Sequence, residues 1–173
     1  MAQELENQFK DAIQLMKQLL LTSVVEEGGV PAPSVFMITR RTPKVDDTLF
    51  FKEVGTPIEK APSVITVLSP FLVSAPGEPV IAEAKFWELV HTTARDSRAY
   101  AVVVGMECGL EAKQLKSRGA FLATKCGSDY QAFVSPITPG VDRCSLGPWQ
   151  YAGYTDLASR VRRWLEGEAQ CRS

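Results

Sequence analysis

The stretch from Gly77 to Gly109 constrains the fold most, because it joins a turn, an amphipathic helix pattern and the most apolar strand of the chain. Pro79 stands at the first helical position, where a missing backbone N–H is tolerated, so the sequence predicts a helix from there to about Ser97. One face of this helix is apolar along its length, with Ala82, Phe86, Leu89, Val90, Thr93 and Ala94. Such a helix has to pack on another element.

A second apolar strip flanks the first on the same helix. It consists of Val80, Ala84, Trp87 and His91, so the apolar arc is wider than one sheet surface normally covers. Two coverings are open: the terminal helix of the same chain, or a partner subunit, for which tryptophan is a favoured anchor. The two differ in whether Trp87 is covered by its own chain.

The run from Ala99 to Gly109 is rich in valine and predicts a strand buried on both faces at the centre of a sheet. Side chains alternate along a strand, so even-numbered and odd-numbered residues face opposite sides. The even face carries Tyr100, Val102, Val104, Met106 and Cys108. The odd face carries the smaller residues Ala101, Val103 and Gly105, followed by Glu107. Small residues let a helix approach closely, and we expect the preceding helix to lie on this face.

The other elements follow from periodicity and turn residues. A first helix is predicted from Glu4 to Val25, with a stop at Gly28, and a last helix is predicted after the capping residue Thr155. The stripe expected to be buried in the first helix is Leu5, Phe9, Ala12, Ile13, Met16, Leu19, Leu20 and Val24. Strands are predicted at 34–40, 48–54, 63–68, 99–109, 121–126 and 130–135.

The first two of these strands are expected to form one hairpin, and the last two another hairpin around the Gly-Ser turn at 127–128. A short helix is expected at 111–117. Segment 136–153 contains many proline and glycine residues but also large apolar side chains, so we expect an ordered loop packed on the core.

This order of elements predicts an α+β fold in which three main helices pack on a mainly antiparallel sheet of about six strands. The elements run helix, three strands, helix, three strands, helix. A doubly wound fold needs regular alternation of strands and helices, which the pattern lacks. With 173 residues, 45% of them hydrophobic, the chain is long enough for a single domain over 1–173, with a tail from 167 expected to be frayed.

Composition narrows the classes of function. Nineteen basic and twenty acidic residues give a net charge of -1, which disfavours a dedicated nucleic-acid binder. Basic clusters at 40–44 and 160–163 are partly neutralised by nearby aspartates. The N-terminus lacks the layout of a signal peptide, and the apolar tract 63–75 is too short to cross a bilayer. We therefore expect a cytoplasmic protein without a membrane segment.

The cysteines do not predict a metal site. Cys108, Cys126, Cys144 and Cys171 are widely spaced, and the chain has one histidine, His91. Zinc sites and disulfide frameworks normally contain short local pairs. We expect free thiols, no metal and no cofactor.

Two groups of residues contain the parts of a reactive or phosphate-binding site. His91, Glu107 and Cys108 provide an imidazole, a carboxylate and a thiol, but adjacent strand residues point to opposite faces, so one histidine does not readily serve both. The pair Gly105 and Gly109 is spaced too closely for a phosphate-binding loop and lacks the following Lys-Ser or Lys-Thr pair. The sequence therefore leans against an enzyme.

The sequence predicts a non-catalytic accessory module that binds a partner protein or a second copy of itself. The candidate interface or ligand-binding residues are Trp87, His91, Tyr100, Glu107, Cys108 and Trp149. The alternative is a small-molecule-binding protein or an enzyme with a pocket lined by Trp87, His91, Tyr100 and Glu107. A flat patch containing Trp87 and Trp149 favours the first, and a closed cavity with convergent polar groups favours the second.

Overall fold

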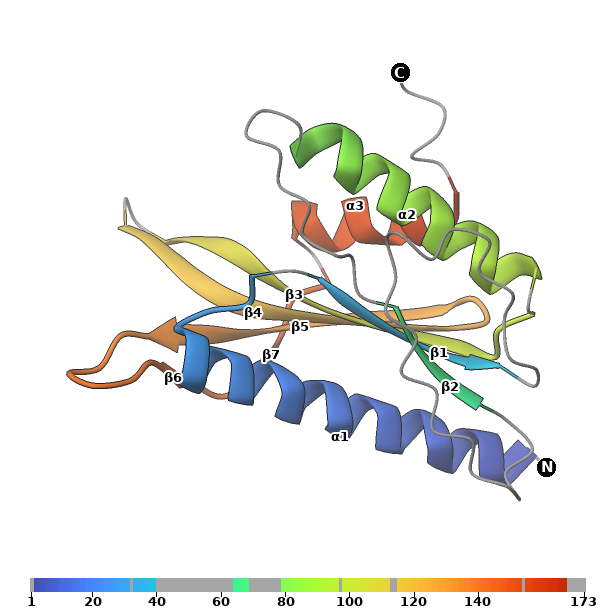
Figure 1. The fold of residues 1–173 in the computed structure, drawn as a ribbon, viewed down its shortest axis with the longest axis horizontal. Coiled ribbons are helices and arrows are strands. Elements are labelled where there is room, and N and C mark those ends of the chain that lie inside the picture. Colours follow the sequence, from blue (N-terminus) through green and yellow to red (C-terminus); the bar gives the residue numbers. More distant parts are fainter. Residues whose placement is uncertain are drawn as a thin grey trace.

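The computed structural model describes residues 2–31, 33–39, 64–68, 79–96, 98–112, 115–153 and 155–167. In this part of the chain three helices pack on one antiparallel sheet, so the predicted α+β class is confirmed (Figure 1). The helices are α1 (Ala2–Glu27), α2 (Pro79–Asp96) and α3 (Asp156–Leu165). The strands are β1 (Ser34–Thr39), β2 (Val64–Leu68), β3 (Ala101–Ala112), β4 (Leu115–Cys126), β5 (Asp129–Thr138), β6 (Ser145–Leu146) and β7 (Gln150–Tyr151).

The strand order in the sheet is β2-β1-β3-β4-β5-β6, and β7 also pairs with β5. Every one of these pairings is antiparallel. The longest pairing joins β3 to β4 along their full lengths, from Ala101 opposite Cys126 to Ala112 opposite Leu115. Since β3 lies between β1 and β4, the most apolar strand is central, as predicted.

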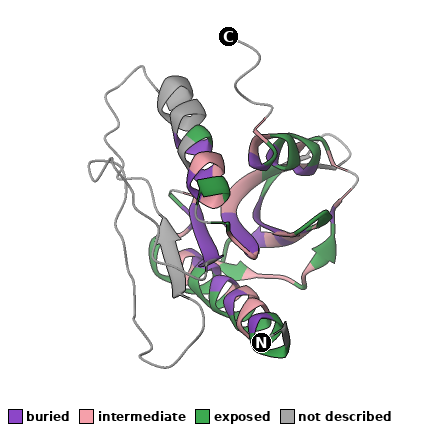
Figure 2. Cartoon of the chain, turned by 90° about the vertical axis from the view of Figure 1, so that its right-hand side faces the viewer, coloured by how far each residue is buried: buried purple, intermediate pink, exposed green. Residues whose placement is uncertain are grey.

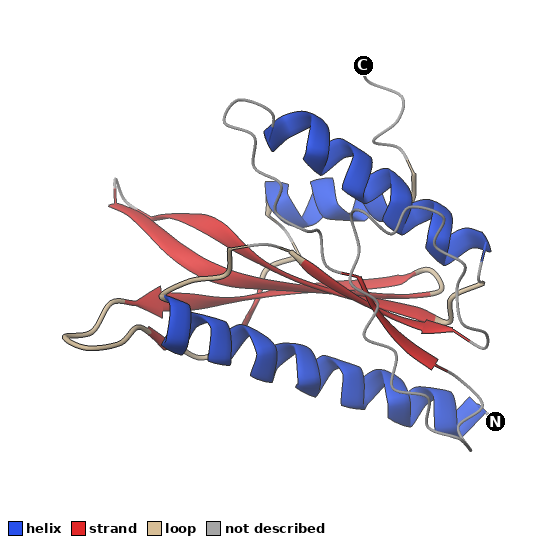
Figure 3. Cartoon of the chain, in the orientation of Figure 1, coloured by secondary structure: helices blue, strands red, loops and turns tan. Residues whose placement is uncertain are grey.

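The sheet lies between two layers of helices, with α1 on one face and with α2 and α3 on the other (Figures 1 and 3). The core on the α2 side includes Val35, Met37, Trp87, Val102, Val104, Phe121 and Val161. The core on the α1 side includes Met16, Leu20, Phe36, Ile38, Val103 and Leu122. Buried residues follow the surfaces where helices and sheet meet (Figure 2). None of the described helices is long and apolar enough to cross a membrane.

The prediction that α2 lies on the small face of β3 is wrong, because α1 lies there. A side chain at Gly105 would clash with Met16, with its Cβ 2.9 Å from Met16 Cγ and 3.2 Å from Leu20 Cδ2. The close approach therefore depends on the absence of a Cβ. The two shorter helices share the other face, where larger side chains such as Val102 and Val104 fill the space beneath them.

The predicted helix at 111–117 is also wrong, because β3 continues to Ala112 and β4 begins at Leu115. Pairing along a long hairpin satisfies the backbone groups of both arms and outweighs a weak local helix pattern. In segment 136–153, Leu146 and Trp149 pack against the α1-side core as predicted, whereas Val141 and Tyr151 are exposed, and the segment contains the short strands β6 and β7. The predicted strand 48–54 lies outside the described residues. The hairpin expected between it and the first strand is wrong, because both edges of β1 are paired with other strands, β2 and β3.

The helix caps agree with the sequence. The Thr155 hydroxyl accepts a hydrogen bond from the Ala158 N–H at 3.2 Å and donates one to the Ala152 carbonyl at 2.7 Å. Gly28 has a φ of 77°, and its N–H donates to the Val24 carbonyl at 3.0 Å, which ends α1. The tail beyond Gly167, which was expected to be frayed, lies outside the described part of the chain.

Replacing Gly105 by alanine is expected to lower the free energy of unfolding by about 1–3 kcal/mol, because the added methyl group overpacks the contact with Met16. Gly109→Ala is the matched control in the same strand. Among the described residues, no atom outside its chain neighbours lies within 4 Å of its Cβ position, so its free energy of unfolding should change by less than about 0.5 kcal/mol. Urea denaturation followed by circular dichroism measures both variants. Equal stability of Gly105→Ala and the wild type would contradict the close approach.

Candidate functional site

The six candidate residues lie on both sides of the sheet and do not form one site. Trp87 and His91 are on α2, and Cys108 packs on the same side. Tyr100 and Trp149 pack against the α1-side core, and Glu107 hydrogen-bonds to the segment that follows α1. The structure therefore does not bring Trp87, His91, Tyr100 and Glu107 together, and it places Glu107 on the opposite side of the sheet from His91 and Cys108.

The Cys108 thiol is a poor nucleophile in this setting. Burial, and then the negative charge of Glu107, raises the pKa of Cys108 to about 11. The thiolate is the reactive form of cysteine, and little of it exists near neutral pH at such a pKa.

Trp87 is a core residue, only 1% exposed. Its ring stacks on Trp164 of α3 with centroids 5.0 Å apart and an interplanar angle of 22°, and it meets Phe86 edge to face at 5.1 Å. The terminal helix of the same chain thus covers the second apolar strip of α2 here, which was the first of the two options. Its indole Nε1 is buried and has no hydrogen-bond partner among the described residues.

His91 connects α2 to the end of α3. Its Nδ1 lies 2.9 Å from the Leu165 carbonyl oxygen, which only accepts hydrogen bonds, so Nδ1 carries the proton. Gly167, with a φ of 84°, lies against the ring, and a Cβ there would be 2.6 Å from Nε2. The last carbonyls of a helix need donors from outside the helix, so His91 acts as a cap for α3.

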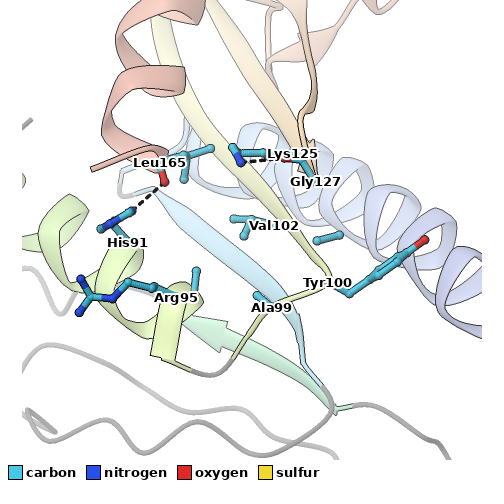
Figure 4. Close-up of a pocket in the computed structure, with 10 residues that line it drawn as sticks. His91, Arg95, Ala99, Tyr100, Val102, Lys125, Gly127 and Leu165 are labelled. Carbon is cyan, nitrogen blue, oxygen red and sulfur yellow. Dashed lines mark hydrogen bonds between the residues drawn. The ribbon is translucent and has the colours of Figure 1, made fainter. Parts of the chain in front are cut away.

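A pocket of about 210 Å³ lies beside His91, between the end of α2, the start of β3, the β4–β5 turn and the end of α3 (Figure 4). Ala94, Ala99, Val102 and Leu165 contribute apolar walls, and Arg95 and Lys125 contribute positive charge. Two of the four predicted pocket residues, His91 and Tyr100, line it. The Tyr100 ring, however, points away from His91 toward α1 (Figure 4).

The charges around this pocket have structural partners. Lys125 Nζ donates to the Gly127 carbonyl at 2.8 Å, and Arg95 Nε pairs with Asp96 at 3.1 Å. Arg95 stands in the last turn of α2, and His91 caps α3, so both complement the negative C-terminal ends of helices. Arg95 and His91 therefore contribute to helix ends, and Lys125 contributes to the β4–β5 turn, so the described polar groups around this pocket already have partners.

Glu107 fixes the end of α1 to the sheet. Its carboxylate accepts hydrogen bonds from Arg118 Nη2 at 2.6 Å, from Arg118 Nε at 3.1 Å and from the Val30 N–H at 3.0 Å. Arg118 Nη2 also donates to the Gly28 carbonyl at 2.9 Å. The β3–β4 register makes Glu107 and Arg118 diagonal neighbours, because Glu107 lies opposite Ala120. We call this arrangement the Glu107–Arg118 clamp.

The electrostatics of the clamp favour the charged carboxylate. Burial alone would raise the pKa of Glu107, but the hydrogen bonds from Arg118 and Val30 and the positive charge of Arg118 outweigh it, so the pKa is below its ordinary value. Arg118 was not among the predicted site residues. The pairing of β3 with β4 would have identified Arg118, since it places an arginine diagonally across from a glutamate in an apolar strand.

A larger hollow, of about 520 Å³, lies along one flank of α1 beside β1. We call it the α1 groove, and its lining includes Leu15, Leu19, Thr22, Glu26, Glu27 and Phe36. The first four of these are spaced at i, i+4, i+7 and i+11, so they follow one side of the helix. Leu15 is 49% exposed and Leu19 37% exposed. The prediction of a buried Leu19 is therefore wrong, because the buried face of α1 is narrower than its apolar pattern.

No family model, curated protein or solved structure matches this chain. Within the described ranges, no three His, Cys, Asp or Glu side chains gather in a way that would hold a metal ion. Cys108, Cys126 and Cys144 are half-buried free thiols.

Glu107→Gln is expected to remove part of the pH dependence of stability. Because the pKa of Glu107 is lowered by folding, the carboxylate stabilises the fold above its ordinary value of about 4.5, and this contribution is lost as the pH falls through the folded pKa. At pH 7 the free energy of unfolding of the wild type should exceed that of the variant by only about 1 kcal/mol, since the Glu107 and Arg118 side chains are 29% and 51% exposed.

Urea denaturation across a pH series measures this difference. Arg118→Met is the control. It should lower the free energy of unfolding of the wild type by a similar amount and that of Glu107→Gln by much less, because the ion pair is already broken in Glu107→Gln. If the difference in free energy of unfolding between the wild type and Glu107→Gln stays constant as the pH falls, the role given to the clamp is wrong.

Proposed function

We propose that the protein is a non-catalytic module that binds another protein through the α1 groove. The observation that carries this proposal is the pair of exposed leucines, Leu15 and Leu19, beside Phe36 in a hollow of about 520 Å³. Of the five large apolar side chains that are exposed among the described residues, these two line the groove. Clustered exposed apolar side chains next to a hollow are typical of interaction sites.

The shape of the groove suits a helix. From Leu15 to Glu26 the lining residues of α1 cover about 16 Å at 1.5 Å per residue. A partner helix with apolar residues at i, i+3 or i+4, and i+7 places its anchors over a comparable length. Leu15 and Leu19 are one turn apart and would lie between successive anchors.

The placement of His91, Glu107 and Cys108, a reactive set that the sequence already disfavoured, favours binding over catalysis. His91 is engaged as the cap of α3, Glu107 is engaged in the clamp, and Cys108 has a raised pKa. A nucleophilic site needs its base within hydrogen-bond reach of the nucleophile. Trp87, which the sequence suggested as the anchor, is covered by Trp164, so the proposed interface moves from α2 to α1.

The proposed function predicts that a helical peptide with a leucine stripe binds the α1 groove. The probe is a fluorescein-labelled, hydrocarbon-stapled peptide of about 14 residues with leucines at i, i+4 and i+7 and glutamine elsewhere; the staple offsets the low helicity of short peptides. Fluorescence anisotropy should show saturable binding. Leu15→Ser combined with Leu19→Ser should weaken it at least about tenfold, since both apolar contacts are lost.

Leu21→Ser is the matched control, because Leu21 is 46% exposed on the same helix and does not line the groove. This variant should bind the peptide as the wild type does. If the wild type does not bind, or if all three proteins bind equally, the groove is not an interaction site. Thermal denaturation verifies that the serine variants remain folded.

A further inference from the structure

We infer that the partner presents a helix with basic residues beside its apolar stripe, seated so that these residues lie next to Glu26 and Glu27. This inference rests on the proposed function and specifies the chemistry of the occupant of the same groove. Glu26 and Glu27 both line the α1 groove, and none of the basic residues in the described part of the chain does. An apolar floor with acidic residues at one end fits a segment that combines leucine-like side chains with lysine or arginine.

The charges of α1 as a whole are also mostly negative. The helix has five acidic residues and two basic ones, and its last turn has none that is basic. Lys10 pairs with Glu6 at 3.0 Å, and the Lys17 ammonium lies 5.9 Å from the centre of the Trp149 ring, so neither lines the groove. Arg118, which lies near the end of α1, is neutralised by Glu107 in the clamp.

The helix dipole adds to this field. The C-terminal end of α1 carries a partial negative charge. Glu26 and Glu27 stand in its last turn, which contains no lysine or arginine. Arg118 already donates to the Gly28 carbonyl at the end of α1, so positive side chains of a partner would meet the two carboxylates. This makes the C-terminal end of the groove the more selective end, while Leu15 and Leu19 supply apolar contact at the other.

A second copy of the chain fits this surface less well. In a two-fold arrangement the same surface meets itself, so an antiparallel pair of α1 helices brings Glu26 and Glu27 of one copy toward Leu15 and Gln18 of the other. The described lining of the groove offers no cation there, so a second copy would leave both carboxylates without a charged partner. A basic partner helix would supply that partner.

The inference is tested with three stapled peptides that share the leucine stripe and differ only at its flanks, which carry glutamine, lysine or glutamate. Anisotropy titrations at low ionic strength should give about tenfold tighter binding for the lysine peptide than for the glutamine peptide, and weaker binding for the glutamate peptide. The lysine advantage should shrink as salt is added, because the carboxylates are exposed to solvent.

Two double variants separate a local effect from the net charge of the protein. Glu26→Gln with Glu27→Gln should remove most of the lysine advantage. Glu88→Gln with Asp129→Asn changes the net charge equally at exposed positions away from the groove, and it should retain the advantage. If both double variants lose it equally, the preference is a long-range effect and the placement beside Glu26 and Glu27 is wrong.

The remaining outcomes distinguish this inference from the proposed function. Equal binding of all three peptides, still lost in the Leu15→Ser and Leu19→Ser double variant, would overturn the basic partner and leave the groove as a protein-binding site. Absence of binding by every peptide would overturn both. A dimer in sedimentation equilibrium that the same double variant dissociates would replace the partner helix by a second copy of this chain.

Discussion

The close approach of α1 to the centre of the sheet is the contact on which the rest of the arrangement depends. Gly105 leaves room for Met16 and Leu20, so the long helix lies directly on the central strand β3. This position leaves the other face of the sheet to α2 and α3, where Trp87 and Trp164 stack between the two helices. It also determines which side of α1 is buried, and hence that Leu15 and Leu19 remain exposed at its flank.

Local patterns in the sequence were sufficient for most of the elements. The caps at Thr155 and Gly28 and the 127–128 turn were readable because each depends on residues close together in the chain. The choice of helix for the small face of β3 was not readable, because Gly105 accommodates either neighbour and only the packing of the whole chain decides. The helix expected at 111–117 was wrong for a related reason, since the pairing of β3 with β4 outweighed a local preference.

The candidate site was harder to predict than the fold. The apolar arc around Trp87 was correctly identified, but a tryptophan suited to an interface is equally suited to a core, and Trp164 of the same chain covers it. Arg118 could be paired with Glu107 only after the strand register was known. The α1 groove was missed because exposure of Leu19 depends on how far the neighbouring strands extend beneath the helix, which periodicity does not report.

The Glu107–Arg118 clamp has a consequence for the proposed binding beyond its effect on stability. It holds the backbone at Gly28 and Val30, immediately after the end of α1 that carries Glu26 and Glu27. The backbone that follows α1 is therefore held in place, so a partner that bound the α1 groove as proposed would not have to order it. Glu107 would then affect the proposed binding without contacting the partner, by keeping the end of the helix that carries Glu26 and Glu27 in position.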